Sequence, residues 1–314
     1  MRRRDLMWLA GLTAPALCLS LPTLAAEREL RVGVQKYGSL VLLKERDLLE
    51  KRLAPLGWTV TWTEFPGGPQ LLEALNVGAI DFGTTGEAPP IFAQAAGAPL
   101  VYVGYEPSAP QGEAILVPQD SPLRGVVDLK GKKVAFNKGS NVHYLVVRAL
   151  QAAGLGYEDI EPVYLPPADA RAAFERGAVD AWAIWDPFLA AAQAATGARV
   201  LTDGAGLVKN HQFYLAALPF ASAQPALVQG ILADLAEVDS WAAANPAEAA
   251  AVLSPKMGVP VPVLEVALGR LGYGVRPLDE AVVAEQQKIA DTFHALGLLP
   301  KPIEVRQAVW KAST

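Results

Sequence analysis

Cysteine is almost absent from this sequence: among 314 residues there is only Cys18, which lies in an N-terminal segment that we expect to be removed. A mature chain without thiols has no disulfide, no cysteine nucleophile and no cysteine-ligated metal. Histidine is also rare, and His143, His211 and His294 are too scattered for a metal-binding spacing. The G-x-S-x-G and Walker patterns are absent as well. We therefore expect no catalytic residue, no metal and no cofactor.

The start of the chain differs in composition from the rest. Three arginines are followed by an apolar run from Leu6 to Leu21 and by small residues at Ala25 and Ala26. This order is typical of an export signal over residues 1–26, cleaved near Ala25/Ala26. The general secretory route is favoured, and the arginine pair leaves the twin-arginine route open. A retained membrane anchor is the alternative, and the prolines in and beside the run count against it.

Positive charge is in the minority, with 27 Lys and Arg against 32 Asp and Glu. Removal of residues 1–26 takes away three Arg and one Asp, which leaves 24 against 31 and a net charge of −7. We therefore expect no nucleic-acid partner. Long apolar runs are also absent after residue 26, so we expect a mature protein that is soluble and monomeric.

Segments typical of strands and helices alternate along the chain. Residues 30–34 and 58–65 are apolar and β-branched as in strands, and residues 39–53 carry the apolar stripe of one helix. The alternation predicts an α/β fold in which mainly parallel sheets are flanked by helices. Residues 225–246 and 281–299 are typical of amphipathic helices, which we expect to pack on the first of two lobes.

An internal repeat indicates that the two lobes are related. The segments LNVGAIDFG (residues 75–83) and FERGAVDAW (residues 174–182) share the pattern Gly-Ala-aliphatic-Asp. Each copy follows a predicted helix and leads into a predicted strand. We expect Asp81 and Asp180, which end the shared pattern, to make structural hydrogen bonds.

Glycine, proline and polar residues mark the lobe boundaries. We place lobe 1 at residues 27–107 and 211–314, and lobe 2 at residues 108–210. Two strands near residues 106–112 and 204–210 then cross between the lobes, and two crossings make a hinge.

Polar turns follow several predicted strands, at the edge where open α/β sheets bind ligands. Exposed helix N-termini with hydroxyl or amide side chains nearby are typical of an anion site. A large ring at a strand-to-helix corner, such as Trp185, can wall an apolar pocket. The candidate ligand-binding residues are Gln35, Gly38, Ser39, Thr84, Thr85, Gly86, Lys138, Gly139, Ser140, Asn141, Trp185, His211 and Tyr214.

Several candidates also have a purely structural interpretation. Ser39 can be a helix N-cap, and Lys138 can be a solvated charge beside other lysines. Trp185 can fill the core instead of walling a pocket. His211 and Tyr214 can reach the cleft or only brace the hinge. These alternatives stay open at the level of sequence.

Four segments resemble one protein family closely: DFGTTGEAPPIFAQAAGAPLVYVGYE, KGKKVAFNKGSNVHYLVVRAL, AWAIWDPFLAAA and NHQFYLAA. They are similar to the periplasmic aliphatic-sulfonate-binding proteins of bacterial ABC importers, and the resemblance extends from about residue 30 through the C-terminal helices. It implies a two-lobed type II periplasmic binding fold. It also implies a protein that closes on a small organic sulfonate and delivers it to a membrane permease for sulfur supply.

The resemblance leaves related ligands and one other class open. Taurine- and nitrate-binding proteins are relatives, and a sulfonate needs only neutral N–H and hydroxyl donors because its single charge is spread over three oxygens. Glu87 can in principle select the amine of taurine, but we expect it to stabilise the N-terminus of its own helix. Enzymes of pyrimidine-precursor synthesis share the fold, but they use a catalytic His and cysteines, and the mature chain has no cysteine.

Overall fold

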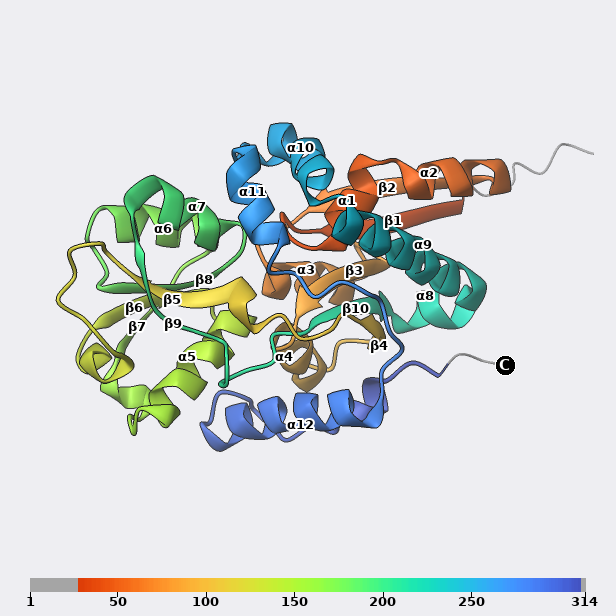
Figure 1. Cartoon of the computed structure of the whole chain (residues 1–314). Coiled ribbons are helices and arrows are strands. Elements are labelled where there is room, and N and C mark those ends of the chain that lie inside the picture. The colour runs from red at the N-terminus through yellow and green to blue at the C-terminus, as the bar shows by residue number, and fades with distance from the viewer. Residues whose placement is uncertain (1–27, 312–314) are drawn as a thin grey trace, which may run out of the picture.

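The computed structural model describes residues 28–311, so the predicted export signal lies outside the described residues. Two five-stranded sheets lie in two neighbouring lobes, each flanked by helices (Figure 1). We call the lobe that contains the N-terminal strand the first lobe, and the other one the second lobe. The predicted two-lobed α/β architecture is confirmed.

The sheet of the first lobe has the strand order β2-β1-β3-β10-β4. Apolar side chains alternate along its first strand, where Leu30, Val32 and Val34 are buried. This strand pairs in parallel with β2 and β3, whereas β10 runs antiparallel between β3 and β4. The strands are β1 (Arg28–Val34), β2 (Trp58–Glu64), β3 (Phe82–Gly86), β4 (Leu100–Tyr105) and β10 (Gln212–Ala217).

The sheet of the second lobe has the order β7-β6-β8-β5-β9 and repeats the same pattern. Strand β6 pairs in parallel with β7 and β8, and β5 runs antiparallel between β8 and β9. The strands are β5 (Glu113–Val117), β6 (Lys133–Phe136), β7 (Glu161–Tyr164), β8 (Ala181–Trp185) and β9 (Arg199–Asp203).

Both sheets are mainly parallel, as the sequence predicted, and one strand in each runs in the opposite direction to the other four. The antiparallel strand of each sheet is the one that the chain enters directly after it has crossed from the other lobe. The chain crosses between Tyr105 and Glu113 and returns between Asp203 and Gln212. It therefore enters each sheet from the side of the neighbouring lobe, where the parallel strands end, and must run in the opposite direction.

The repeated Gly-Ala-aliphatic-Asp pattern has the same structural role in both lobes. Asp81 Oδ2 accepts a hydrogen bond from the Arg31 backbone N–H at 2.9 Å, and Asp180 Oδ2 accepts one from the Lys133 backbone N–H at 2.8 Å. In each lobe the carboxylate thus lies just before one strand and accepts a hydrogen bond from the backbone of the neighbouring strand. The prediction that these aspartates make structural hydrogen bonds is confirmed.

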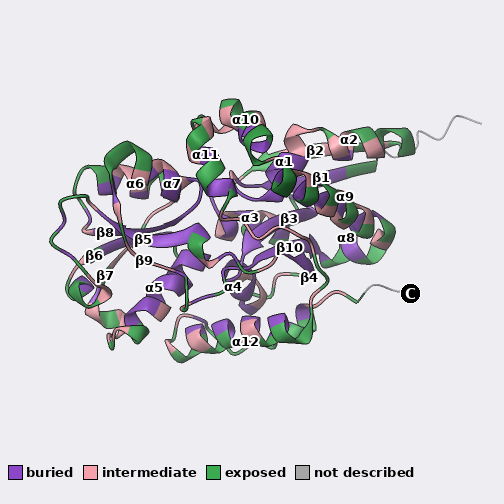
Figure 2. Cartoon of the chain, viewed as in Figure 1, coloured by how far each residue is buried: buried purple, intermediate pink, exposed green. Residues whose placement is uncertain are grey.

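Helices cover both sheets, and their apolar faces turn inward, as Figure 2 shows by the buried colour on the sides that face the strands. The helices of the first lobe and the C-terminal part are α1 (Ser39–Glu45), α2 (Leu48–Leu53), α3 (Gly68–Asn76), α4 (Pro89–Ala95), α8 (Leu218–Ala223), α9 (Pro225–Ala244), α10 (Pro246–Met257), α11 (Val261–Leu268) and α12 (Glu280–Ala295). Those of the second lobe are α5 (Asn141–Ala152), α6 (Pro167–Glu175) and α7 (Phe188–Thr196).

The single helix predicted over residues 39–53 is wrong, because the structure has two helices there. Asp47 adopts φ 52, a left-handed conformation that ends the first helix and starts the second. The guanidinium carbon of Arg46 lies 3.9 Å from the centroid of the Trp241 ring in α9. This contact comes from a distant part of the chain, so the local apolar stripe does not predict the break.

Buried apolar side chains form two clusters. One lies between the sheet of the first lobe and helices such as α1 and α9. The other runs through both lobes and joins Leu71 and Ile91 of the first to Leu116 and Val134 of the second. The lobes therefore lie against each other. Among residues 28–311 no single helix has the length and apolarity to cross a membrane, although α10 and α11, bent by 119°, pass that test as a pair.

Candidate ligand-binding site

Two glycines of the first lobe lie directly against the second lobe. A Cβ on Gly67, which precedes α3, would lie 2.5 Å from Asn137 Nδ2 and 3.7 Å from Trp185 Cη2. A Cβ on Gly86, which ends β3, would lie 2.9 Å from Asn141 Cβ. At these two positions the turns of the two lobes leave no space for a methyl group, so the lobes are closed.

The side-chain amide of Asn137 is an unpaired donor at this contact. The residue is 7% exposed, and its Nδ2 has no hydrogen-bond partner among the described residues. A buried polar group without a partner is costly, so such a group in a native fold is commonly there for a ligand or an ordered water. Asn137 is not among the candidates from the sequence, although Lys138, Gly139, Ser140 and Asn141 of the same turn are. Its position directly after β6 is the signal that could have found it.

Four predicted donors make hydrogen bonds within the protein. Gln35 Nε2 donates to the Thr84 carbonyl at 2.8 Å, and Thr84 Oγ1 donates to the Phe213 carbonyl at 3.1 Å. The hydroxyls of Thr85 and Ser140 donate to backbone carbonyls of their own turns, at 3.0 and 2.7 Å. These side chains hold the turns in shape. The three hydroxyls have no second proton to donate to a ligand, because a hydroxyl carries only one.

The turn before α1 has its helix cap at Gly38, not at Ser39. Gly38 adopts φ 78, a conformation that favours glycine, and Ser39 is the first helical residue. The Ser39 side chain is 1% exposed, and its hydroxyl has no hydrogen-bond partner among the described residues. Ser39 makes no capping hydrogen bond, so the interpretation of Ser39 as an N-cap is wrong.

The turn before α5 is closed by His143. The Gly139 N–H donates to His143 Nδ1 at 3.1 Å, and Gly139 has φ 77. Burial lowers the pKa of His143 to about 3, so the ring is neutral and can accept this bond. Lys138 is exposed, with its Nζ 5.1 Å from the centroid of the Tyr164 ring. The structure thus favours the interpretation of Lys138 as a solvated charge.

Trp185 and Asn141 complete the contact from the second lobe. Trp185 ends β8, is 5% exposed and reaches toward Gly67, so it fills the boundary between the lobes. Asn141 Nδ2 donates to a carboxylate oxygen of Glu113 and to Asn210 Oδ1, the latter at 3.1 Å. Asn210 lies in the second crossing segment, so Asn141 ties the start of α5 to the hinge.

His211 and Tyr214 brace the first lobe and do not reach this contact. His211 Nδ1 is 2.8 Å from the Glu106 carbonyl oxygen, which links the two crossing segments. The Tyr214 hydroxyl donates to the Glu106 carboxyl group, and its ring stacks on Phe82 at a centroid distance of 6.2 Å. His211 thus belongs to the hinge, and the fully buried Tyr214 belongs to the core beneath it.

Three buried glutamates surround the hinge. Burial raises the pKa of Glu87 to about 7 and that of Glu106 to about 8, and it raises the pKa of Glu113 well above its usual range. Glu87 Oε2 accepts a hydrogen bond from the His211 backbone N–H at 3.1 Å. The expectation that Glu87 stabilises its own helix is wrong, since α4 has no side-chain cap and Glu87 instead contacts the second crossing segment.

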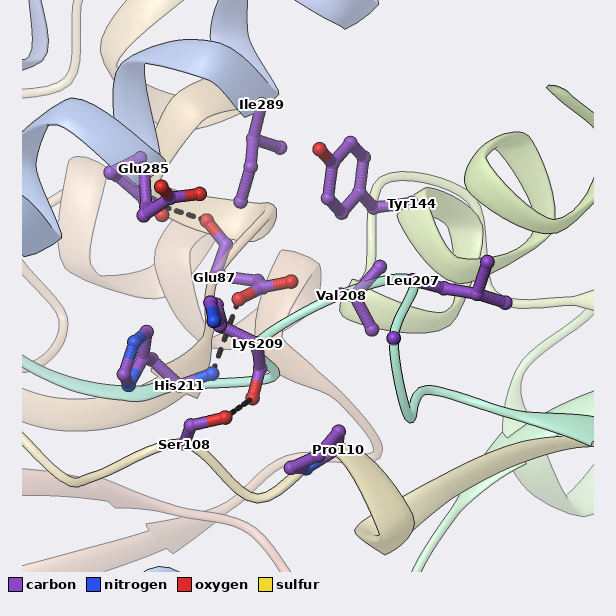
Figure 3. Close-up of a pocket in the computed structure, with 12 residues that line it drawn as sticks. Glu87, Ser108, Pro110, Tyr144, Leu207, Val208, Lys209, His211, Glu285 and Ile289 are labelled. Atoms are coloured by element: carbon purple, nitrogen blue, oxygen red, sulfur yellow. Dashed lines mark hydrogen bonds between the residues drawn. The ribbon is translucent and has the colours of Figure 1, made fainter. Parts of the chain in front are cut away.

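A cavity of about 200 Å³ lies beside the hinge (Figure 3). Both crossing segments line it, together with Tyr144 of α5 and Glu285 of α12. Its lining carries charges of both signs, with Lys209 and two glutamates, which does not suit a single small anion. Within residues 28–311, no three His, Cys, Asp or Glu side chains converge as a metal site would require.

The protein has two lobes joined by two crossing segments. The lobes are closed over strand-end turns that carry an unpaired buried donor. These features define a two-lobed periplasmic-type binding protein. Proteins of this class bind their ligands between the lobes and close by a hinge. The three buried glutamates at the hinge accept hydrogen bonds from a backbone N–H, a tyrosine hydroxyl and an asparagine amide.

Comparison with known proteins agrees with this class. Residues 59–249 match the family described as NMT1/THI5 like. A curated Escherichia coli K12 protein, whose name gives aliphatic sulfonates as its ligand, is 50% identical over 308 residues, which cover 96% of this chain and 95% of that protein. The chain belongs to the family of aliphatic-sulfonate-binding proteins, which are binding proteins and not enzymes.

Solved structures of the family have the same fold. The alkanesulfonate-binding protein SsuA from Xanthomonas axonopodis pv. citri, bound to MOPS, is 48% identical, covers 90% of this chain and 98% of its own, and gives a TM-score of 0.87. The periplasmic aliphatic sulphonate binding protein SsuA from Escherichia coli is 50% identical, with 91% and 93% covered and a TM-score of 0.82.

Proposed function

We propose that this protein captures aliphatic sulfonates between its two lobes in the periplasm and delivers them to the membrane permease of an ABC importer. The unpaired, buried amide of Asn137 beside the ring of Trp185 carries the proposal. A neutral donor suits the oxygens of a sulfonate, which stays ionised at physiological pH and needs no proton transfer. An aromatic wall suits its alkyl tail.

The ligand-binding residues we propose all lie at the contact between the lobes. Asn137 supplies a side-chain donor and Trp185 an apolar wall, while Gly67 and Gly86 allow the backbones of the first lobe to approach. The turns before α1 and α5 contribute backbone N–H groups near helix N-termini. Gln35, Thr84, Thr85 and Ser140 act indirectly, by holding these turns in shape.

Calorimetry of the purified mature protein tests this function. The titrants are methanesulfonate, hexanesulfonate, taurine, nitrate and sulfate. We expect the alkanesulfonates to bind with exothermic, saturable curves and the inorganic anions to bind at least a hundredfold more weakly. Tighter binding of nitrate or sulfate would make the chain an inorganic-anion binder, and a clear preference for taurine would identify a zwitterion site.

Export is the second part of the proposal. The relatives are periplasmic proteins, and the first 26 residues have the composition of an export signal. N-terminal sequencing of the protein recovered from a periplasmic extract should begin at or next to residue 27. Recovery of the intact Met1 terminus in the membrane fraction would instead indicate a retained anchor.

A further inference from the structure

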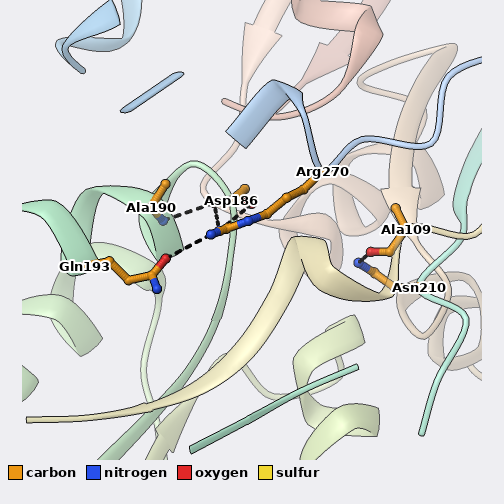
Figure 4. Close-up of polar contacts among 6 residues, drawn as sticks. All are labelled: Ala109, Asp186, Ala190, Gln193, Asn210 and Arg270. Atoms are coloured by element: carbon orange, nitrogen blue, oxygen red, sulfur yellow. Dashed lines mark hydrogen bonds and ion pairs between the residues drawn. The ribbon is translucent and has the colours of Figure 1, made fainter. Parts of the chain in front are cut away.

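An arginine outside the strand-end turns joins the two lobes. Arg270 follows α11, and this helix packs on α7 of the second lobe, while its neighbour α10 packs on α1 of the first lobe (Figure 1). The Arg270 guanidinium lies 3.2 Å from Asp186 Oδ2 and 3.3 Å from Asp186 Oδ1 (Figure 4). It also donates to Gln193 Oε1 of α7 at 3.1 Å. All three bonds cross the boundary between the lobes.

The carboxylate in this pair is buried inside the closed protein. Asp186 is 1% exposed, whereas the Arg270 side chain is 24% exposed. Within its own lobe, Asp186 Oδ1 accepts one hydrogen bond from the Ala190 N–H at 3.0 Å. Arg270 is the cation that balances the charge of Asp186 among the described residues, and it comes from the other side of the cleft.

We propose that Arg270 is a positioning residue for ligand capture, which pairs with Asp186 and Gln193 in the closed arrangement and so holds the second lobe against the first. The inference rests on the proposed function, because it assigns Arg270 a share in the closure that traps the sulfonate. Arg270 does not lie among the turns that meet at Gly67 and Gly86. It acts through Asp186, the residue next to Trp185.

The physical reason is a difference between the two states of the hinge. When the lobes part, Asp186 loses Arg270 but gains water. When they close without Arg270, the carboxylate is buried with no cation, and removal of one partner of a buried pair is strongly unfavourable. A ligand shifts the equilibrium only through its differential affinity for the two states. Loss of Arg270 therefore penalises the closed state alone and weakens every ligand that requires closure.

The position of Asp186 connects this pair to the binding site. Asp186 directly follows Trp185 at the end of β8, and Trp185 reaches Gly67 of the first lobe. The ion pair therefore fixes the strand end that carries the apolar wall. Loss of Arg270 should weaken ligands with short and long tails to the same extent, since it changes closure and not the wall itself.

The test compares four proteins by calorimetry with methanesulfonate and hexanesulfonate: wild type, Arg270→Met, Asp186→Asn/Arg270→Met and Arg52→Met. Arg52 is the matched control, because it pairs with Asp234 at 2.7 Å between α2 and α9, within the first lobe. We expect Arg270→Met to bind both sulfonates at least tenfold more weakly. The double variant should recover most of this loss, because it no longer buries an unpaired charge, and Arg52→Met should bind like the wild type.

Equal affinities of Arg270→Met and wild type would overturn the inference, as would a double variant no tighter than Arg270→Met. If the wild type binds neither sulfonate, the proposed function fails, and small-angle scattering of the unliganded proteins still tests the positioning role. In that case Arg270→Met should have the larger radius of gyration, while Arg52→Met should match the wild type. Identical radii in all three would remove the role of Arg270 in closure.

Discussion

Gly67 and Gly86 show how closely the two lobes approach at the scale of single residues. Neither residue has a positive φ, so the backbone conformation at these two positions does not require glycine. Each is glycine where a Cβ would meet an Asn side chain of the other lobe at less than 3.0 Å. The absence of a side chain on the first lobe is therefore what permits the donors of the second lobe to reach the cleft.

Gly86→Ala should impair ligand binding without unfolding the protein. The added methyl group meets Asn141 Cβ at 2.9 Å in the closed protein, and this carbon is fixed to the backbone of α5. Overpacking of this kind costs about 1–3 kcal/mol, which is roughly a five- to hundredfold loss of affinity. The melting temperature without ligand should fall less than the loss of affinity implies, because the lobes can part and so avoid the clash. A large drop in that temperature would place the clash inside the first lobe.

Asn137 and Trp185 should respond differently to the length of the sulfonate tail. Loss of a hydrogen bond to a charged group costs about 1.5–3 kcal/mol, so Asn137→Ala should weaken all alkanesulfonates by roughly ten- to a hundredfold. Trp185→Ala should weaken hexanesulfonate more than methanesulfonate, since it removes apolar wall. Calorimetry with both ligands separates the two effects. Equal losses for both tails in Trp185→Ala would place this ring in the core alone.

Helix α12 connects the lobes at the scale of secondary-structure elements. Near its C-terminal end, the fully buried ring of Phe293 lies 4.9 Å from Phe92 of α4 and 5.1 Å from His143 of α5, measured between ring centroids. These partners belong to different lobes. The sequence predicted that this amphipathic helix packs on the first lobe, and the structure adds the contact with the second.

Phe293→Ala should destabilise the fold and also weaken ligand binding. Truncation of a buried Phe costs about 3–5 kcal/mol, which urea unfolding would detect as a lower free energy of unfolding. Phe174→Ala is the matched control, because Phe174 is also buried but packs on Trp182 within the second lobe. The control should lose stability but keep its affinity for sulfonates. If both variants lost affinity to the same extent, α12 would have no special role in closure.

Buried titratable groups give the whole molecule an optimum of stability in acid. The pKa of Glu106 rises from 4.5 to about 8 because of burial, so the folded state keeps a proton that the unfolded chain releases above pH 4.5. This stability is present below pH 4.5 and is lost as the pH rises through 8. His143 acts in the opposite sense: its pKa falls from 6.5 to about 3, so stability is lost as the pH falls from 6.5 toward 3.

The pKa values of Glu87 and Glu113 are raised as well, so the buried glutamates together outweigh His143. The free energy of unfolding should therefore be highest near about pH 5 and fall toward pH 8, by about 1.4 kcal/mol for each pKa unit that separates the folded and unfolded carboxyl groups. Glu106→Gln should flatten the fall between about pH 5 and pH 8, because the amide does not titrate and can still accept the hydrogen bond from Tyr214. Urea unfolding at several pH values measures both curves. Parallel curves would show that Glu106 keeps an ordinary pKa.

Most of the fold follows from local patterns, and the site follows only in part. The strand predictions at residues 30–34 and 58–65 agree with β1 and β2, because alternating and β-branched residues fit a pleated sheet. The turns before α1, α4 and α5 were found because Gly, Pro and hydroxyl residues mark helix starts. Gly67 and Arg270 were missed, since nothing local distinguishes a glycine or arginine that faces another lobe.

The sequence by itself determined the α/β class, the likeness of the two lobes and the positions of the turns that end the strands. Each of these depends on composition or on neighbours within a few residues. Only the tertiary structure decided that each sheet contains an antiparallel strand, that the Asn137 amide is an unpaired donor between the lobes, that Ser39 and Tyr214 are buried and that Arg270 reaches Asp186. These features depend on contacts between residues far apart in the sequence, such as Arg270 and Asp186, which are 84 positions apart.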